Sequence, residues 1–406
     1  MLLTLIPFFD ESMTVSAYSF FSQKQNYLTE PRLQGTSSFD GAAEILAFDV
    51  IKKIGLDSLS NGKEVFVPVN NISLFADINA QCNAPHNKVM LLLDNSIEPN
   101  DLYINRIKEL KSAGYLFAIR KVAVQNYERY SPIFKLMDFI VLDHKKIDLF
   151  KAKLYFNKVF PNVKLVAGNI ETVDIFEALK KEGGYELYEG EFFRIPINKG
   201  EHDVSPLKVN YIRLLNVVNN DNFDLSKAAD IVGQDTALVI SLLKMVNTMS
   251  INSEITSIRH AAAMLGQKEL KKWINTAVTN ELYADKPNEV TRLSLIRAKF
   301  AENLAPAFEM AVHASELFLM GVFSVIDIIL EMPMEKALEI VTVSKEVKET
   351  LVEKKGKYAP VYYFMVKYEE ADWQEVSRLM IIHNISLDQV YSAYIDALKW
   401  YKDLFF

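Results

Sequence analysis

The feature that most constrains the fold is a change in hydrophobic pattern near residue 200 of this 406-residue chain. Before it, short runs rich in apolar and β-branched residues alternate with amphipathic stretches. Runs such as Val89–Leu93 are apolar on consecutive positions, so both faces of these strands are expected to be buried. Alternating strands and helices with two-sided burial predict a parallel sheet or barrel.

The predicted strands of this first half are Leu2–Phe9, Thr14–Phe21, Glu64–Asn70, Lys88–Asp94, Tyr115–Val122, Asp138–Asp143, Lys164–Ile170 and Leu187–Phe193. The amphipathic stretches between them are predicted to be helices, over Gly41–Ile54, Asn100–Ala113, Lys146–Val159 and Val173–Lys181.

After Pro206 the strand pattern disappears. Helices are predicted over Leu214–Asn219, Leu225–Val232, Thr236–Thr248, Ile258–Leu265, Lys268–Thr279, Leu293–Ala305, Ser315–Leu330 and Ser344–Val352. Asp224 and Asp235 stand where helix N-caps are expected. The polar segment Asn198–Pro206 separates the two patterns, so we expect an α/β barrel domain over residues 1–200 and an all-helical domain over residues 201–406.

Composition excludes several classes of protein. The single cysteine, Cys82, rules out a disulfide scaffold and sites that need several thiolates. A formal net charge of -7 gives no general attraction to nucleic acid or to anionic membranes. The apolar run Met1–Phe9 has no basic leader, and no stretch is expected to reach the ~20 apolar residues of a transmembrane helix. We therefore expect a cytoplasmic protein without membrane insertion.

The second half resembles the HDOD domain, and the whole chain resembles the EAL–HDOD family of bacterial signalling proteins. The segments that carry the HDOD resemblance are Gln234–Asn247, Ile255–Gly266 and Phe318–Asp327, the last followed by Met332-Pro333. The first half is similar to a shortened, eroded EAL domain, a relative of the (β/α)₈ barrel. In active members of that family, this domain hydrolyses cyclic di-GMP with two divalent metals at the carboxyl ends of the strands.

The resemblance maps the family's metal and catalytic positions onto this chain. They fall on Ser19, Asn70 (or Asn71), Asp94, Arg120, Lys121, Val141, Asp143, Glu171 and Glu189. Ser19 replaces the glutamate that names the EAL triplet, and Arg120 and Lys121 replace two adjacent aspartates. Hard divalent cations need several clustered oxygen ligands, and a pair of cations at that place repels them. The resemblance thus implies a degenerate site that holds no metal, uses no cofactor and catalyses no hydrolysis.

Arg120 and Lys121 leave two interpretations open. They form salt bridges with Asp94, Asp143 or Glu171, which we favour, or they donate hydrogen bonds to the phosphates of an anionic ligand.

Several other motifs have less specific interpretations. The dipeptide His202-Asp203 matches metal-dependent phosphohydrolases, but it lies in a linker and the other histidines lack ligand spacing. Leu225–Asn247 is similar to a helix-turn-helix, yet its second helix is apolar on most sides, which predicts burial rather than DNA binding.

The basic pairs Lys271-Lys272 and Lys354-Lys355 are interpreted as solvated helix faces or ends rather than anion sites. Cys82 has no neighbouring base apart from His86, which argues against a nucleophile.

The sequence therefore predicts a non-catalytic signalling protein that acts through contacts with unidentified signalling proteins. Two rival hypotheses remain: a receptor that binds cyclic di-GMP without cleaving it, and a metal-dependent phosphodiesterase with an atypical site.

Overall fold

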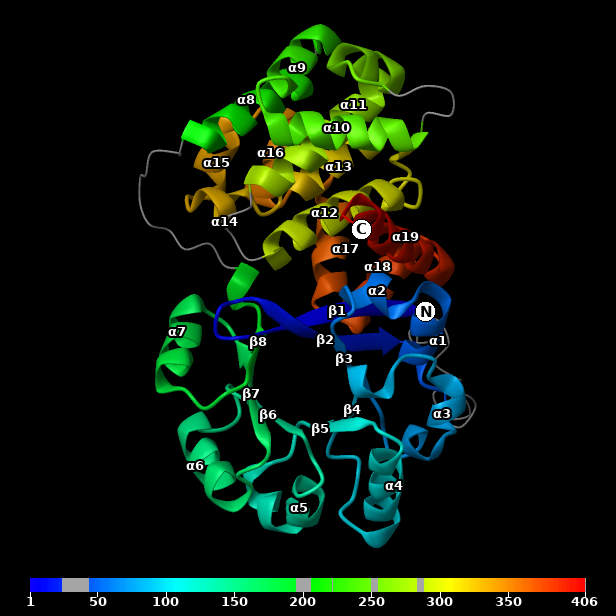
Figure 1. Ribbon diagram of the computed structural model, residues 1–406, viewed down its shortest axis with the longest axis vertical. Coiled ribbons are helices and arrows are strands. Elements are labelled where there is room, and N and C mark those ends of the chain that lie inside the picture. Colours follow the sequence, from blue (N-terminus) through cyan, green and yellow to red (C-terminus); the bar gives the residue numbers. More distant parts are fainter. Residues whose placement is uncertain (24–43, 195–205, 221, 250–254, 283–287, 406) are drawn as a thin grey trace. The chain divides into compact units, whose positions relative to one another are not determined.

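Figure 1 shows the computed structural model, which describes residues 1–23, 44–194, 206–220, 222–249, 255–282 and 288–405. The chain forms two compact units. The first comprises Met1–Ile195, Ala307–Glu309 and Phe364–Phe406, and the second comprises Pro196–Pro306 and Met310–Tyr363. The second unit is thus inserted into the sequence of the first.

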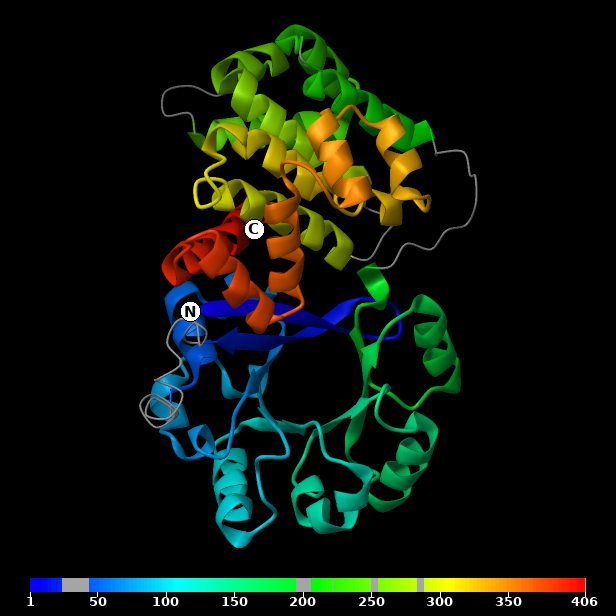
Figure 2. The same ribbon diagram turned by 180° about the vertical axis from the view of Figure 1, so that it is seen from behind.

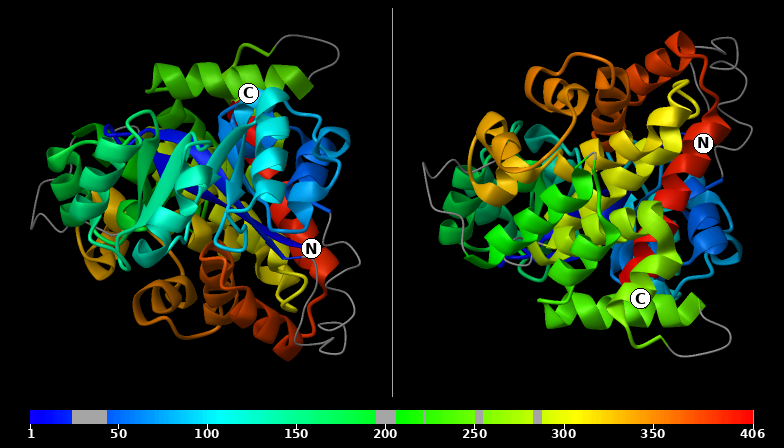
Figure 3. Two further views of the ribbon diagram at one scale, coloured as in Figure 1. Left: turned by 90° about the horizontal axis from the view of Figure 1, so that it is seen from below. Right: turned by 90° about the horizontal axis from the view of Figure 1, so that it is seen from above.

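The first unit contains a closed barrel with the strands in the order β1-β2-β3-β4-β5-β6-β7-β8. These strands are β1 (Leu2–Phe9), β2 (Val15–Gln23), β3 (Glu64–Pro68), β4 (Val89–Leu93), β5 (Leu116–Ile119), β6 (Phe139–Asp143), β7 (Lys164–Ile170) and β8 (Leu187–Gly190). Strand β1 is antiparallel to both β2 and β8, whereas the other neighbours are parallel. Figure 3 shows the barrel from below. The predicted α/β barrel and its strands are confirmed.

Apolar side chains fill the barrel interior and explain why the strands are buried on both faces. The core consists of Phe8, Ala17, Phe66, Met90, Leu92, Ala118, Phe139, Val166 and Leu187. The Phe66 ring packs edge-on against Phe8 and against Phe139, with ring centroids 4.5 and 5.8 Å apart. This interior is solid, so any ligand must approach at an end of the barrel.

Helices lie outside the strands (Figure 1). They are α1 (Leu46–Ile54), α2 (Leu56–Ser60), α3 (Ile78–Gln81), α4 (Asp101–Ser112), α5 (Tyr127–Phe134), α6 (Leu149–Val159) and α7 (Val173–Glu182). Short 3-10 turns are η2 (Ser73–Phe75), η3 (His86–Lys88), η4 (Val124–Asn126) and η5 (Phe192–Arg194).

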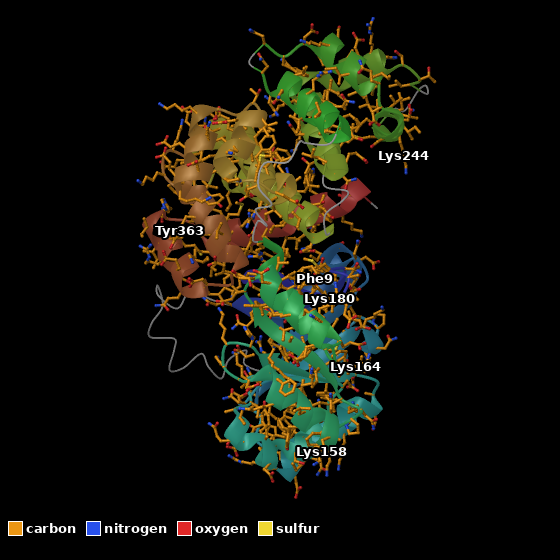
Figure 4. The ribbon with its side chains drawn as sticks, turned by 90° about the vertical axis from the view of Figure 1, so that its left-hand side faces the viewer. Phe9, Lys158, Lys164, Lys180, Lys244 and Tyr363 are labelled. Atoms are coloured by element: carbon orange, nitrogen blue, oxygen red, sulfur yellow. The ribbon has the colours of Figure 1, made fainter. Side chains whose placement is uncertain are left out.

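Side-chain caps fix where the main outer helices begin. Asn100, Asp148 and Thr172 accept hydrogen bonds from backbone N–H groups in the first turns of α4, α6 and α7. Figure 4 labels two surface lysines of this outer layer, Lys158 on α6 and Lys180 on α7.

The C-terminal helices are α17 (Ala359–Glu369), α18 (Trp373–Ile382) and α19 (Leu387–Phe405) (Figures 1 and 2). Helix α17 begins in the inserted unit, and from Phe364 onward the chain belongs to the first unit. Within β1, Phe8 and Phe9 are the residues that pair with β8. The first part of β1 therefore has no strand neighbour on that side. The Leu3 N–H donates to the Tyr368 hydroxyl at 3.0 Å, and Thr4 Oγ1 lies 3.5 Å from the Tyr394 hydroxyl. These contacts correct the expected division after residue 200, because residues 364–406 belong with the barrel.

The second unit is all-helical, as predicted. Its elements are α8 (Pro206–Asn219), α9 (Leu225–Val232), α10 (Thr236–Met249), α11 (Ile258–Leu282), α12 (Asn288–Leu304), η6 (Ala311–His313), α13 (Ala314–Phe323), α14 (Ile326–Leu330), α15 (Met334–Ile340) and α16 (Lys345–Glu353). Asp224 and Asp235 cap α9 and α10, as predicted. Gly266, at φ 73°, breaks α11 between the two helices predicted there.

Helices α12 and α13 pack closely through Gly321. A Cβ atom at this position would lie 2.3 Å from Ala298 Cα, so only glycine permits this approach. One stretch, Ala311–Leu330, is long and apolar enough to cross a membrane, contrary to expectation. It is divided into η6, α13 and α14, and 67% of it is buried, which is typical of core helices.

Candidate functional site

A pocket of about 760 Å³ opens where β5, β6, β7 and β8 end. Parallel strands direct their carboxyl ends to one side of a barrel, which is where such folds place their binding residues. Most of the predicted site residues line this pocket, namely Ser19, Arg120, Lys121, Val141, Asp143, Glu171 and Glu189. The structure therefore gathers residues that are up to 170 positions apart in the sequence, from 19 to 189.

Two predicted positions do not line the pocket. Asn70 Oδ1 accepts the N–H groups of Ile72 and Ser73, at 2.9 and 2.8 Å, and so stabilises the turn after β3. Asp94 Oδ1 accepts the Ser96 N–H at 2.9 Å in the turn after β4. Both side chains have local structural roles, and the alternative position Asn71 is exposed.

Arg120 follows β5 directly, and its N–H donates to the Leu93 carbonyl at 3.0 Å. Its guanidinium carbon lies 5.0 Å from the centroid of the Phe21 ring, while Nε is buried without a hydrogen-bond partner. Burial lowers the pKa of Arg120, whereas the negative charges of Glu189 and Asp94 raise it. Arg120 is therefore a cation with unused hydrogen-bonding capacity in the pocket wall.

Lys121 adopts a left-handed backbone conformation, with φ 63°, and its side chain is exposed. This conformation is uncommon for a residue other than glycine. Lys121 thus lies at the rim, beside the more deeply placed Arg120.

Glu189 lies on β8, opposite Phe8 of β1, and its Oε2 accepts the Asn169 N–H at 3.0 Å. Burial raises the pKa of Glu189, and the Asn169 hydrogen bond and the Arg120 charge only partly oppose this. Burial thus favours the protonated form of this carboxyl group.

Ser19 places a neutral group in the same pocket. Its side chain is 1% exposed, and Oγ has no hydrogen-bond partner. No charge from this position attracts a cation.

The favoured salt bridges of Arg120 and Lys121 are absent from the described residues, so that prediction is wrong. Two lysines that follow β6 form ion pairs with these carboxylates instead. Glu171 pairs with Lys145 at 2.6 Å, and Asp143 pairs with Lys146 at 3.5 Å. Lys145 and Lys146, which follow β6, reach these carboxylates, whereas Arg120 lies against Phe21.

Three carboxylates on the pocket rim were not predicted. Glu369, Glu370 and Asp372 come from the end of α17 and the turn before α18. Lys367 pairs with Glu370 at 2.6 Å and lies 3.8 Å from Asp372. No local motif in the sequence marks these residues, because their place depends on the return of the chain to the barrel.

The donor set does not fit the pair of divalent metals that the EAL resemblance implies. In the parts of the chain that the structure describes, no three His, Cys, Asp or Glu side chains cluster closely enough to hold an ion. Ser19 contributes no charge, and the Arg120 guanidinium repels cations. We therefore derive no metal-dependent step at this pocket.

The remaining sequence candidates lie elsewhere. His202-Asp203 and most of the linker Asn198–Pro206 fall outside the described residues. In the helix-turn-helix-like segment, Leu238, Leu242 and Val246 are buried.

The cysteine and the predicted basic pairs have local interactions. Burial raises the pKa of the Cys82 thiol, which disfavours the thiolate. Lys354 Nζ donates to the Leu351 carbonyl, whereas Lys272 pairs with Glu302 at 2.8 Å and is not simply solvated.

Comparisons with known proteins agree with the two-part architecture. Residues 204–355 match the family model of the HDOD domain, which confirms the predicted HDOD domain. The match ends before α17.

Two curated relatives extend beyond this domain. The uncharacterized protein YuxH of Bacillus subtilis (strain 168) is 26% identical over 408 residues, which cover 98% of this chain and 97% of YuxH. The cyclic di-GMP phosphodiesterase CdgJ of Vibrio cholerae is 29% identical over 331 residues, covering 79% of this chain and 74% of CdgJ.

Among solved structures, an EAL domain protein from Listeria monocytogenes EGD-e is similar at a TM-score of 0.36 and 13% identity. The match covers 47% of this chain and 86% of the Listeria chain.

Proposed function

We propose that this chain is a non-catalytic protein of cyclic di-GMP-related bacterial signalling, which acts through contacts with other proteins. In this proposal the barrel is a degenerate EAL-type domain joined to the HDOD domain. The similarity to CdgJ supports the link to cyclic di-GMP signalling.

The observation that carries the proposal is the Arg120 guanidinium in the pocket wall. Its Nε is buried and has no hydrogen-bond partner, and Glu189 nearby has a raised pKa. Hydrolysis of a phosphodiester by metal-activated water needs clustered anionic ligands. A buried cation in place of a carboxylate removes ligands and adds repulsion.

The decisive experiment is an assay of cyclic di-GMP hydrolysis by the full chain with Mg²⁺ or Mn²⁺. We expect no linear dinucleotide in chromatography over hours, with an active EAL protein as the positive control. Product that forms only with metal, and that disappears in Asp94→Ala or Glu171→Ala, would overturn the proposal. Restoring carboxylates at 19, 120 and 121 together is expected not to rescue turnover, because Val141 and Glu189 also depart from the family pattern.

A receptor that binds cyclic di-GMP without cleaving it is the second candidate. Arg120 and Lys121 favour it, because neither has an ion pair in the described residues and both line a pocket of ligand size. The rest of the lining opposes it. Acidic side chains outnumber basic ones in this lining. The basic residues are Arg120, Lys121, Lys145 and Arg194, and the acidic residues are Asp143, Glu171, Glu189, Glu191, Glu369, Glu370 and Asp372.

Titration calorimetry distinguishes the receptor from the interaction protein. We expect no binding of cyclic di-GMP tighter than about 1 µM, with or without Mg²⁺. If tight binding appears, Arg120→Gln should abolish it, while Lys158→Gln on the outer helix α6 should leave it unchanged. That pattern would establish the receptor. Without binding, capture of partners from the native cell with the full chain as bait becomes the direct test.

A further inference from the structure

A second pocket, of about 430 Å³, lies wholly within the helical unit. Its walls come from α11, α12 and α13 and from the connection between α8 and α9. The volume is within the range of small-molecule sites. None of the residues assigned to the barrel site belongs to it.

Three lysines of α11 line this pocket, Lys268, Lys271 and Lys272. They are opposed by one carboxylate in the lining, Glu302. Glu302 is already shared, because it accepts hydrogen bonds from Lys272 and from Lys299, each at 2.8 Å. The pocket therefore has a positive balance, whereas the chain as a whole has a net charge of -7.

Lys272 is held in place by its neighbours, whereas Lys268 is exposed at the pocket edge. Lys272 Nζ lies 5.4 Å from the centroid of the Phe318 ring. Burial lowers the pKa of Lys272, although its bond to Glu302 counteracts this. Gly266 interrupts α11, so Lys268 lies in the first turn of the following segment, where the helix dipole disfavours a cation. An anion in the pocket would relieve both costs.

The remainder of the pocket combines apolar walls with polar groups that are already satisfied. Phe318 and Leu319 are 3% and 8% exposed. The buried Asn275 amide donates to the Lys271 carbonyl at 2.9 Å and exchanges hydrogen bonds with Asn219. The lining thus combines cations with an aromatic and aliphatic surface.

We propose that this pocket binds a small organic anion, in which a phosphate, sulfonate or carboxylate meets the lysines and an apolar body contacts Phe318 and Leu319. Charge-assisted hydrogen bonds from lysine supply the specificity for the anion. The apolar body distinguishes such a ligand from inorganic phosphate.

The test uses a fluorescent probe of this chemistry, 1-anilinonaphthalene-8-sulfonate, titrated into the full chain. N-phenyl-1-naphthylamine has the same rings without the sulfonate, and we expect it to bind about tenfold more weakly. Added salt should weaken binding of the sulfonate and leave the uncharged probe unaffected.

Charge reversal then localises the site. We expect Lys268→Glu with Lys271→Glu to weaken sulfonate binding about tenfold or more. The matched control makes the same charge change on α16 of the same unit, as Lys345→Glu with Lys348→Glu, and should bind as the wild type does.

Equal binding of both probes, the absence of saturable sulfonate binding, or equal binding by the two double variants would overturn the proposal. If circular dichroism shows that the α11 variant is unfolded, the comparison of the two probes on the wild type decides. This outcome is independent of the cyclic di-GMP assays.

Discussion

The two pockets, one in each unit, both place a partly buried glutamate near cations, yet the two carboxyl groups have opposite pKa shifts. Glu302 accepts hydrogen bonds from Lys272 and Lys299, which lower its pKa although burial would raise it. Among the described residues, Glu189 has the Asn169 N–H as its one direct donor, and burial raises its pKa despite the charge of Arg120. A cation stabilises a buried carboxylate mainly when it donates directly to it.

The comparison shows that the residue types in a pocket do not by themselves determine the charge state of its carboxyl groups. Both pockets contain the pairing of a glutamate with basic residues that a motif search would score alike. In the helical pocket Lys272 pairs directly with Glu302, while in the barrel pocket Arg120 packs against Phe21 and the Asn169 N–H donates to Glu189. The following predictions test how far the two units differ, beginning with the largest expected effect.

The helical unit depends on close packing of α12 against α13. Gly321→Ala should lower the free energy of unfolding by about 3 kcal/mol, because its Cβ would overlap Ala298 Cα. Chemical denaturation measures this loss. Gly233→Ala is the control in the same unit, since its nearest neighbour would lie at 3.3 Å and its φ is -61°. If Gly321→Ala lowered the free energy of unfolding as little as Gly233→Ala does, α12 and α13 would have to move apart at little energetic cost.

The barrel unit depends on residues at the end of the chain. Tyr368→Phe should lower the free energy of unfolding by about 1–3 kcal/mol, because the Leu3 N–H loses its 3.0 Å acceptor in a buried setting. Tyr394→Phe removes a longer contact of 3.5 Å and should cost less. Denaturant titration of the full chain measures both, and a reversed order would contradict the role given to Tyr368.

The two glutamates should affect the pH dependence of stability in opposite directions. The pKa of Glu302 is lowered, so its stabilising contribution is present above its ordinary value of 4.5 and is lost as pH falls through the lowered pKa. Glu302→Gln should therefore cost about 1–2 kcal/mol at neutral pH, with a smaller deficit in acid.

For Glu189 the sign reverses. Its raised pKa means that the wild type loses stability as pH rises from 4.5 through that pKa, because the unfolded chain releases the proton in this range while the buried group retains it. Glu189→Gln should thus gain stability relative to the wild type as pH rises. Unfolding curves for both variants between acid and neutral pH provide the measurement, and parallel profiles would remove the contrast between the pockets.

The smallest effect is expected at Ser19. Its Oγ is buried without a partner, so Ser19→Ala should leave the free energy of unfolding within about 1 kcal/mol, with any change stabilising. A substantial loss would mean that the hydroxyl group binds a water molecule or ligand.

The sequence predicted the barrel strands because their burial on both faces requires continuous apolar runs. It predicted most helices because their apolar residues recur at a helical spacing. They did not predict α5, since Pro132 lies inside it and a proline normally signals a break. Helix α17 has buried residues at a helical spacing, Val361, Phe364, Met365 and Tyr368, so a signal for it was present.

The candidate site was predicted only in part. The carboxyl ends of the strands converge, so Arg120 and Glu189 could be placed together from their positions in the sequence. Asn70 and Asp94 begin the turns that follow β3 and β4, and their side chains accept N–H groups of those turns instead of lining the pocket. The acidic rim from α17 and α18 could not be predicted, because tertiary packing alone brings it there.

The hydrogen bonds between β1 and the C-terminal helices have a consequence for biosynthesis. The first strand leaves the ribosome more than 300 residues before Tyr368, which covers part of its edge. At about 5–20 residues per second, that strand waits at least ~15 seconds for its last neighbours. Unpaired strand edges invite pairing with other chains. The nascent chain is therefore most prone to aggregation during synthesis of the inserted helical unit, and premature termination there would leave this vulnerability permanent.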